Sequence, residues 1–368
     1  MARLSFRAFR QIDWLLLSAT ILLLLFGLVT LASVTVAKSP PEWSVFFRQL
    51  IFFGIGAFIS FFVIFFDYRV LRGYSSYIYL LALVLLIGVL FFGKTINNTT
   101  GWFVFAGISF QPVELIKLLW IIAFGSYLSR YARAFNQWRH LAISGVFMLV
   151  LLVLIMRQPD LGSAVIILAI YIGLLLMANI KLKQLAILFL ILLTAGVMSY
   201  FFLLQTYQKD RIQVLFHPGS DPLNRGYNVT QSMIAIGSGQ FFGRGFGQGT
   251  QSQLNFLPEQ QTDFIFSVFA EEFGFFGAGL MLIAFGGLLV RSIIIAGKSK
   301  EDFGSFLSAG IGIWFAVQMF INVGMNMGLL PVTGVPLPLV SAGGSSLIAG
   351  LISIGLMQSV FLRARTTT

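Results

Sequence analysis

Residues 14–36 read WLLLSATILLLLFGLVTLASVTV and carry no charged side chain. A helix needs about 20 predominantly apolar residues to cross a bilayer, so this stretch is long enough to span one. Backbone groups in lipid must bond internally, and an unbroken apolar run lacks the alternation of a β-barrel strand. Further candidate spans follow at about 50–66, 75–93, 112–128, 141–156, 162–179, 185–204, 264–290, 305–328 and 344–362. We therefore expect an all-α, polytopic membrane protein with about ten transmembrane helices.

The basic residues predict the orientation of these helices. Arginines precede the first apolar run without a small-residue cleavage pattern, which indicates a retained signal-anchor helix. Cytoplasmic loops carry an excess of Lys and Arg, and one set of loops holds fifteen of these residues against eight in the other. The larger set is Arg3, Arg7, Arg10, Arg69, Arg72, Arg130, Arg133, Arg139, Lys181, Lys183, Arg291, Lys298, Lys300, Arg363 and Arg365. Both termini are therefore expected in the cytoplasm.

The organisation expected from these spans is one membrane domain over residues 1–368. It has a large extracytoplasmic loop at about 205–262, between the seventh and eighth helices. The net charge of +11 is dispersed over short loops. The excess of basic residues in cytoplasmic loops, next to anionic membrane lipids, accounts for most of this charge. A nucleic-acid partner is not expected. The absence of cysteine excludes disulfides, thiolate nucleophiles and cysteine-bound metals.

Asp263 is the first candidate functional residue. It lies where the polar loop re-enters the membrane, in the run QQTDFIF at 260–266. An ionisable residue at such a position is costly to keep, so we interpret it as functional.

A second polar cluster is QPVELIK at 111–117, which includes Gln111 and the pair Glu114 and Lys117. The pair is three residues apart, on one helix face, where the two charges can neutralise each other. It either holds helices together as a buried ion pair or shapes and charges a substrate cavity.

Two further clusters are expected on the outer side. RQPDLG at 157–162 is typical of a turn, and Asp160 either caps the next helix or belongs to a site. The glycine-rich run GSGQFFGRGFGQG at 237–249 carries Arg244. It is either a flexible loop or a place where backbone closely approaches a ligand.

The last cluster combines Pro331, Pro336 and Pro338 with the run SAGGSS at 341–346. Irregular backbone at membrane depth is tolerated only where protein buries it or water lines it. This stretch is therefore expected to form a cavity wall before the last helix.

Taken in order, these motifs resemble the SEDS family of cell-wall proteins over essentially the whole chain. The matching runs are QPVELIK (111–117), QPDLG (158–162), GTQSQLNFLPE (249–259), TDFIF (262–266) with AEE (270–272), and GVPLPLV (334–340). The runs DPLNRGY (221–227) and QSMIAIGSG (231–239) resemble the elongation branch of the family more than its division branch.

The resemblance implies a peptidoglycan glycosyltransferase in the bacterial cytoplasmic (inner) membrane, with its active site on the extracytoplasmic side. Its substrates would be lipid II and the growing glycan strand. Its partners would be a class B penicillin-binding protein and other proteins of the elongation machinery. The essential aspartate of the family falls on Asp263. The implied reaction inverts the donor anomeric carbon, with Asp263 as general base and no covalent sugar intermediate.

The departing pyrophosphate needs positive charge. Arg244 is the leading candidate, followed by Arg48 and Arg211, and a divalent cation, Mg²⁺ or Mn²⁺, could assist, although no ligand set for it is visible. Relatives commonly carry basic residues where this chain has Gly101 and Ser109, so phosphate binding is expected to rest on other positions here.

Two other functions fit the sequence. A transporter or flippase of the lipid-linked precursor would also need many helices, a broken helix and intramembrane charges, but it should expose polar sites on both membrane faces. A non-catalytic scaffold for a penicillin-binding protein would tolerate replacement of Asp263.

Overall fold

The computed structural model describes residues 11–36, 41–96, 99–105, 108–131, 134–135, 137–178, 180–202, 206–216, 225–254 and 256–365. Its elements are α2 (Trp14–Val36), α3 (Ser44–Phe65), α4 (Arg69–Gly73), α5 (Ser75–Phe92), β1 (Lys94–Ile96), β2 (Thr99–Phe105), β3 (Ile108–Phe110), α6 (Pro112–Tyr131), α7 (Trp138–Arg157), α8 (Leu161–Met177), α9 (Leu182–Phe202), α10 (Thr206–Phe216), α11 (Arg225–Ser238), α12 (Thr250–Gln253), α13 (Ile265–Lys298), α14 (Asp302–Asn326) and α15 (Gly344–Arg365).

The expected membrane helices are confirmed. Nine helices in the described part of the chain are long and apolar enough to span a bilayer. The remaining expected span corresponds to α8, which has 17 residues and packs against α14 and α7. At 1.5 Å per residue it is about 26 Å long, close to the hydrocarbon thickness. The protein is therefore a polytopic all-α membrane protein.

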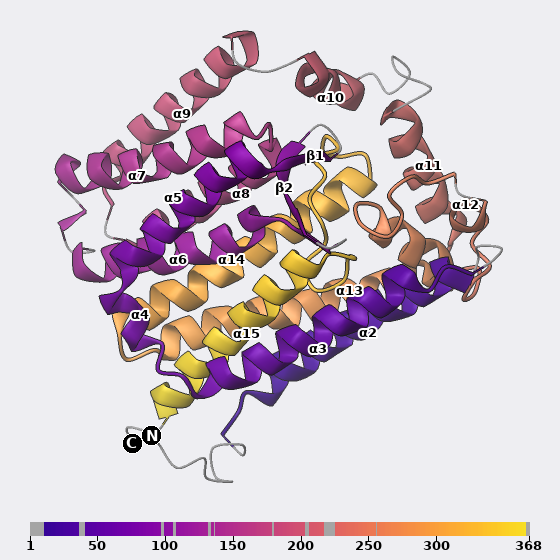
Figure 1. Ribbon diagram of the computed structural model, residues 1–368, viewed down its shortest axis with the longest axis horizontal. Helices are drawn as coiled ribbons and strands as arrows, with labels where there is room; N and C mark the ends of the chain where they lie inside the picture. Colours follow the sequence, from indigo (N-terminus) through magenta and orange to yellow (C-terminus); the bar gives the residue numbers. More distant parts are fainter. Residues whose placement is uncertain are drawn as a thin grey trace.

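The helices α6, α14 and α15 form the centre of the bundle, and most of their residues are buried. The helix α2 lies along α13, and α3 lies along α15 (Figure 1). By contrast, α9 lies at the margin, where its only buried residue is Gln184.

The two ends of the bundle differ in chemistry. The start of α2 and the end of α15 lie at one end, near the marked termini (Figure 1). Ion pairs join helices to connecting segments there: Arg291 with Asp13, Arg69 with Glu301, and Arg363 with Asp67. The opposite end carries the strands and the helices α10, α11 and α12. The termini end is therefore joined by ion pairs, whereas Asp263 and the segment before α13 lie at the end away from the termini.

Two connections at this end contain structure that the sequence did not predict. The segment before α6 forms a small antiparallel sheet, β1-β2-β3, in which Lys94 pairs with Trp102 and Phe103 with Phe110. The expected large loop at 205–262 contains three helices, α10, α11 and α12. Both are polar or short segments that hydropathy passes over, because it detects membrane spans only.

Candidate functional site

Asp263 lies two residues before α13, at the strand-bearing end of the bundle, and its side chain is partly exposed. Its backbone N–H donates to the carbonyl oxygen of Glu259 at 3.1 Å. Its own carbonyl oxygen accepts hydrogen bonds from the side-chain amides of Asn322 at 3.1 Å and Asn326 at 2.9 Å. The backbone that carries the carboxylate is therefore attached to α14 on one side and to its own turn on the other.

The surroundings of Asp263 favour its neutral form. Burial and, to a smaller extent, the nearby negative charge of Glu259 raise the pKa of the Asp263 carboxyl from 3.8 to about 7. Arg211 and a hydrogen bond from Thr262 act in the opposite direction and lower this pKa. A carboxyl group that titrates near neutral pH can accept a proton during a reaction and release it afterwards.

Arg211, on α10, is the basic residue that the structure brings to Asp263. One of its guanidinium nitrogens, Nη1, donates to the carbonyl oxygen of Thr333 at 3.2 Å. The next residue is Gly334, where an added Cβ would lie 3.7 Å from Oδ2 of Asp263. A carboxylate and a guanidinium therefore lie against the same short stretch of backbone.

That stretch, residues 327–343 between α14 and α15, is irregular but well bonded. The carbonyl oxygen of Val335 accepts from Asn322 at 2.8 Å, and that of Pro336 accepts from Gln318 at 2.8 Å. The hydroxyl of Ser341 donates to the carbonyl oxygen of Thr262 at 2.6 Å. Non-helical backbone is tolerated here because side chains of α14 and the turn before α13 satisfy it.

Asp160 caps α8. Its two carboxylate oxygens accept from the backbone N–H and the hydroxyl of Ser163, at 2.9 and 2.7 Å. The same helix start packs closely on the irregular stretch, because a Cβ at Gly162 would lie 2.4 Å from Val335 and 3.2 Å from the carbonyl oxygen of Thr333. The capping interpretation therefore accounts for both oxygens of Asp160, and its helix supports the wall of the site.

Glu114 and Lys117 form a buried ion pair on α6. The Lys117 ammonium lies 2.6 Å from Oε1 of Glu114 and also donates to Gln318 at 3.2 Å. Lys117 is fully buried, so its charge is used inside the protein. Oε2 of Glu114 is buried and has no hydrogen-bond partner. The pair is linked to the site through Gln318, which holds Pro336.

Gln111 lies at the edge of the same region. Its backbone N–H donates to the hydroxyl of Ser345 at 2.8 Å. A Cβ at Gly101 in β2 would lie 3.7 Å from the amide oxygen of Gln158 and 4.0 Å from the amide nitrogen of Gln111. Gly101 therefore faces neutral amides, while Ser109 pairs with Val104 within the sheet.

The glycine-rich run is held against α13 rather than extending freely from the bundle. It packs into a break of α13 at Gly274, whose φ of 66° is not helical. A Cβ at Gly239 or Gly243 would lie 2.0 Å from a carbonyl oxygen of α13. The backbone N–H groups of Arg244 and Gly245 donate to α13 carbonyl oxygens at 3.0 Å. We call residues 239–249 the glycine clip.

Arg244 and Arg48 are both exposed. The Arg244 side chain donates to the carbonyl oxygen of Ser238 at 3.3 Å. Its backbone bonds to Glu271, which lies eight residues beyond Asp263, or about 12 Å along a helix. The charge of Arg211 therefore acts on the Asp263 carboxyl through space, and Arg244 is not among the charges that do so.

Three residues of the site were not identified from the sequence: Gln318, Asn322 and Asn326. They recur every four residues on α14 and are fully buried. An amide stripe at helical spacing inside an apolar span was a usable signal, because polar side chains there are costly unless bonded.

No group of three metal-ligating side chains occurs within the described ranges. Glu259 and Asp263 do supply two interacting carboxylates. Mg²⁺ keeps several waters and binds largely through substrate phosphates in many enzymes, so its binding here would depend on the substrate.

Comparison with known proteins places this site in context. A family model described as cell cycle protein, for the group FtsW, RodA and SpoVE, matches residues 13–366. The chain is 35% identical to the peptidoglycan glycosyltransferase MrdB of Escherichia coli K12 over 292 residues, which cover 79% of each chain. It is 37% identical to the probable peptidoglycan glycosyltransferase FtsW of Nitrosomonas europaea over 365 residues, covering 95% of this chain and 92% of that protein.

Solved structures agree with the fold. A chain from a peptidoglycan synthase complex, described as coordinating polymerisation and crosslinking, superposes with a TM-score of 0.81 at 30% identity. The alignment covers 96% of this chain and 99% of that one. The rod shape determining protein RodA of Thermus thermophilus superposes with a TM-score of 0.71 at 29% identity, covering 96% and 98%.

Proposed function

This chain belongs to the SEDS family, which includes FtsW, RodA and SpoVE, and it is a peptidoglycan glycosyltransferase; we propose that it polymerises lipid II with Asp263 as general base. The observation that carries the proposal is the pairing of a carboxyl group that titrates near pH 7 with the Arg211 guanidinium, on one stretch of backbone. We assign the protein to the elongation branch on the runs at 221–227 and 231–239.

In the proposed reaction, the ionised Asp263 takes the proton from the acceptor sugar hydroxyl. The oxygen attacks the anomeric carbon of the donor as the bond to the pyrophosphate breaks. One displacement inverts the configuration, from an α-linked donor to a β-linked polymer. It needs a single base and no enzyme nucleophile, unlike the carboxylate pair of a retaining glycosidase.

Positive charge must meet the departing pyrophosphate, and Arg211 is placed to supply it. A guanidinium presents several donors and stays charged, which suits phosphate oxygens. A divalent cation, Mg²⁺ or Mn²⁺, would enter with the substrate phosphates, and it would supply neutralisation of charge on the leaving group.

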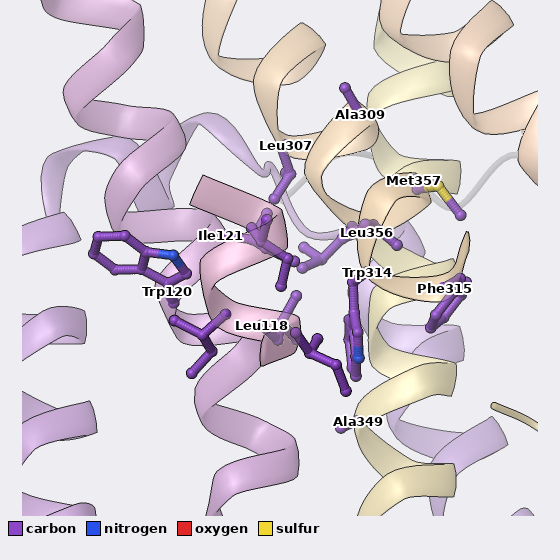
Figure 2. Packing of buried hydrophobic residues seen from close by; sticks show 14 of the residues in the cluster. Leu118, Trp120, Ile121, Leu307, Ala309, Trp314, Phe315, Ala349, Leu356 and Met357 are labelled. Atoms are coloured by element: carbon purple, nitrogen blue, oxygen red, sulfur yellow. The ribbon is translucent and has the colours of Figure 1, made fainter. Parts of the chain in front are cut away.

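A packed apolar layer below the site favours a one-sided enzyme over a transporter. Among the described residues, the next side-chain hydrogen bond of α6 after Lys117 is made by Ser126, and the turns between them pack tightly. Figure 2 shows Leu118 and Ile121 of α6 close to Leu307 and Trp314 of α14 and to Leu356 of α15. A transporter needs polar access from both faces.

We place the site on the extracytoplasmic face and both termini in the cytoplasm, because the basic loops gather at the end of the bundle away from the site. We also propose a class B penicillin-binding protein as partner. The similarity to a chain of a synthase complex that coordinates polymerisation and crosslinking supports this partner.

The test is glycan synthesis from lipid II by purified protein with Mg²⁺, with and without the partner. Wild type should form a glycan ladder, and a folded Asp263→Ala variant should form none. Equal ladders from both would overturn the role of Asp263. No ladder from either, even with the partner, would favour transport or scaffolding.

A further inference from the structure

Asn322 and Asn326 form a buried bridge between Asp263 and the irregular stretch. Both side chains are fully buried on α14, four residues apart. Asn322 donates one N–H to the Asp263 carbonyl oxygen at 3.1 Å and the other to that of Val335 at 2.8 Å. Asn326 donates to the Asp263 carbonyl oxygen at 2.9 Å and to that of Asn322 at 2.8 Å. All four amide protons are therefore used.

The orientation of the Asn326 amide is fixed from the other side. Its oxygen accepts a hydrogen bond from the hydroxyl of Ser267 at 2.5 Å. The hydroxyl of Ser232, on α11, donates its proton to the carbonyl oxygen of Asn326 at 2.7 Å, and its oxygen lies 2.5 Å from that of Ser267. A flipped amide would face two acceptors with its own oxygen and would leave Ser267 without this acceptor.

We propose that Asn322 and Asn326 are positioning residues, which hold the Asp263 carboxylate at a fixed place against Thr333 and Gly334. The inference rests on the proposed role of Asp263 and deepens it. Val335, held by Asn322, directly follows the two residues that lie against Asp263 and bind Arg211. One amide pair therefore fixes the base and the backbone anchor of the guanidinium relative to each other.

The physical consequence follows from geometry. A reacting group displaced by about 1 Å can lose about a hundredfold in rate while substrate binding is kept. A bridge that lies behind the site, without touching substrate, should therefore act on kcat and leave KM nearly unchanged. Loosening it should also admit water to the carboxyl group and move its titration toward lower pH.

The experiment compares Asn322→Ala, Asn326→Ala and the double variant with wild type in lipid II polymerisation from pH 5 to 8.5. We expect kcat of each single variant to fall about 10- to 100-fold, with KM for lipid II within about threefold. The acid limb of the pH profile should move to lower pH. The control is Ser308→Ala, a buried hydroxyl on the same helix without a hydrogen-bond partner, which should keep the wild-type kcat and profile.

Thermal unfolding separates positioning from simple loss of fold. A variant that retains the wild-type unfolding temperature but loses kcat supports the bridge, and so does a shifted pH limb in a less stable variant. Unchanged kcat and pH limb in a folded double variant overturn it, provided that Asp263→Ala is inactive. An active Asp263→Ala variant would instead refute the proposed base, whatever the asparagine variants do.

Discussion

The pKa of Asp263 predicts where the polymerisation rate should fall with acid. A group that titrates at about 7 is half ionised at pH 7, about one tenth ionised at pH 6 and about one hundredth at pH 5. If the ionised form is the base, kcat/KM should drop nearly tenfold per pH unit below neutrality. An aspartate with the ordinary value of 3.8 would give a flat profile over this range.

Two substitutions should move this acid limb in opposite directions. Glu259→Gln removes a negative charge that raises the pKa of Asp263, so the limb should move to lower pH. Arg211→Gln removes a positive charge that lowers the pKa, so the limb should move to higher pH. Arg211→Gln should also weaken lipid II binding, but the position of the limb is independent of that loss.

The assay is the initial rate of glycan formation from limiting lipid II, measured from pH 5 to 8.5 at constant ionic strength and saturating Mg²⁺. Each variant is first checked for an unchanged unfolding temperature. A flat wild-type profile between pH 5 and 7 would refute the raised pKa of a catalytic Asp263. A shift of both variants in the same direction would refute the assigned electrostatics.

Three further predictions concern stability and folding. Because the native pKa of Asp263 lies above its unfolded value, its stabilising contribution is complete below about pH 4 and is lost as pH rises to about 7. Asp263→Asn should therefore unfold at a higher temperature than wild type at pH 8. An equal gain in unfolding temperature at pH 4.5 would contradict this. Lys117→Met removes the partner of the buried Glu114 carboxylate and should destabilise the protein by about 3–5 kcal/mol. The double variant Glu114→Gln with Lys117→Met should recover most of this loss. Thermal unfolding in detergent measures both, and equal destabilisation by the single and double variants would count against the pair. Gly243→Ala should prevent the glycine clip from packing, because its Cβ would lie 2.0 Å from a carbonyl oxygen. Gly247→Ala has a similarly positive φ but its nearest neighbour at 3.8 Å, so it should only strain the backbone. Limited proteolysis at residues 239–249 should cleave the Gly243 variant faster than the Gly247 variant, and equal cleavage would refute the clash.

The glycine clip shows why a motif can be found in a sequence while its neighbour in the fold stays unidentified. Alternating glycines indicate that something approaches the backbone closely, and the structure agrees. The sequence does not identify which group approaches the glycines. In the structure it is the backbone carbonyl oxygens of α13 next to the break at Gly274. The small sheet before α6 was missed for a related reason, since its strands of three to seven residues are stabilised by pairing rather than by hydropathy.

The sequence by itself determined the membrane spans and the polar clusters, and it identified Asp263 as the candidate base. Each is a local property, because about 20 apolar residues suffice to define a span and one carboxyl group at its end is costly. Only the tertiary structure decided which groups surround Asp263. It brings Arg211 from α10, Thr333 from the irregular stretch and two asparagines from α14 to one place. Contacts between segments 50 to 120 residues apart depend on helix packing, which no local pattern specifies.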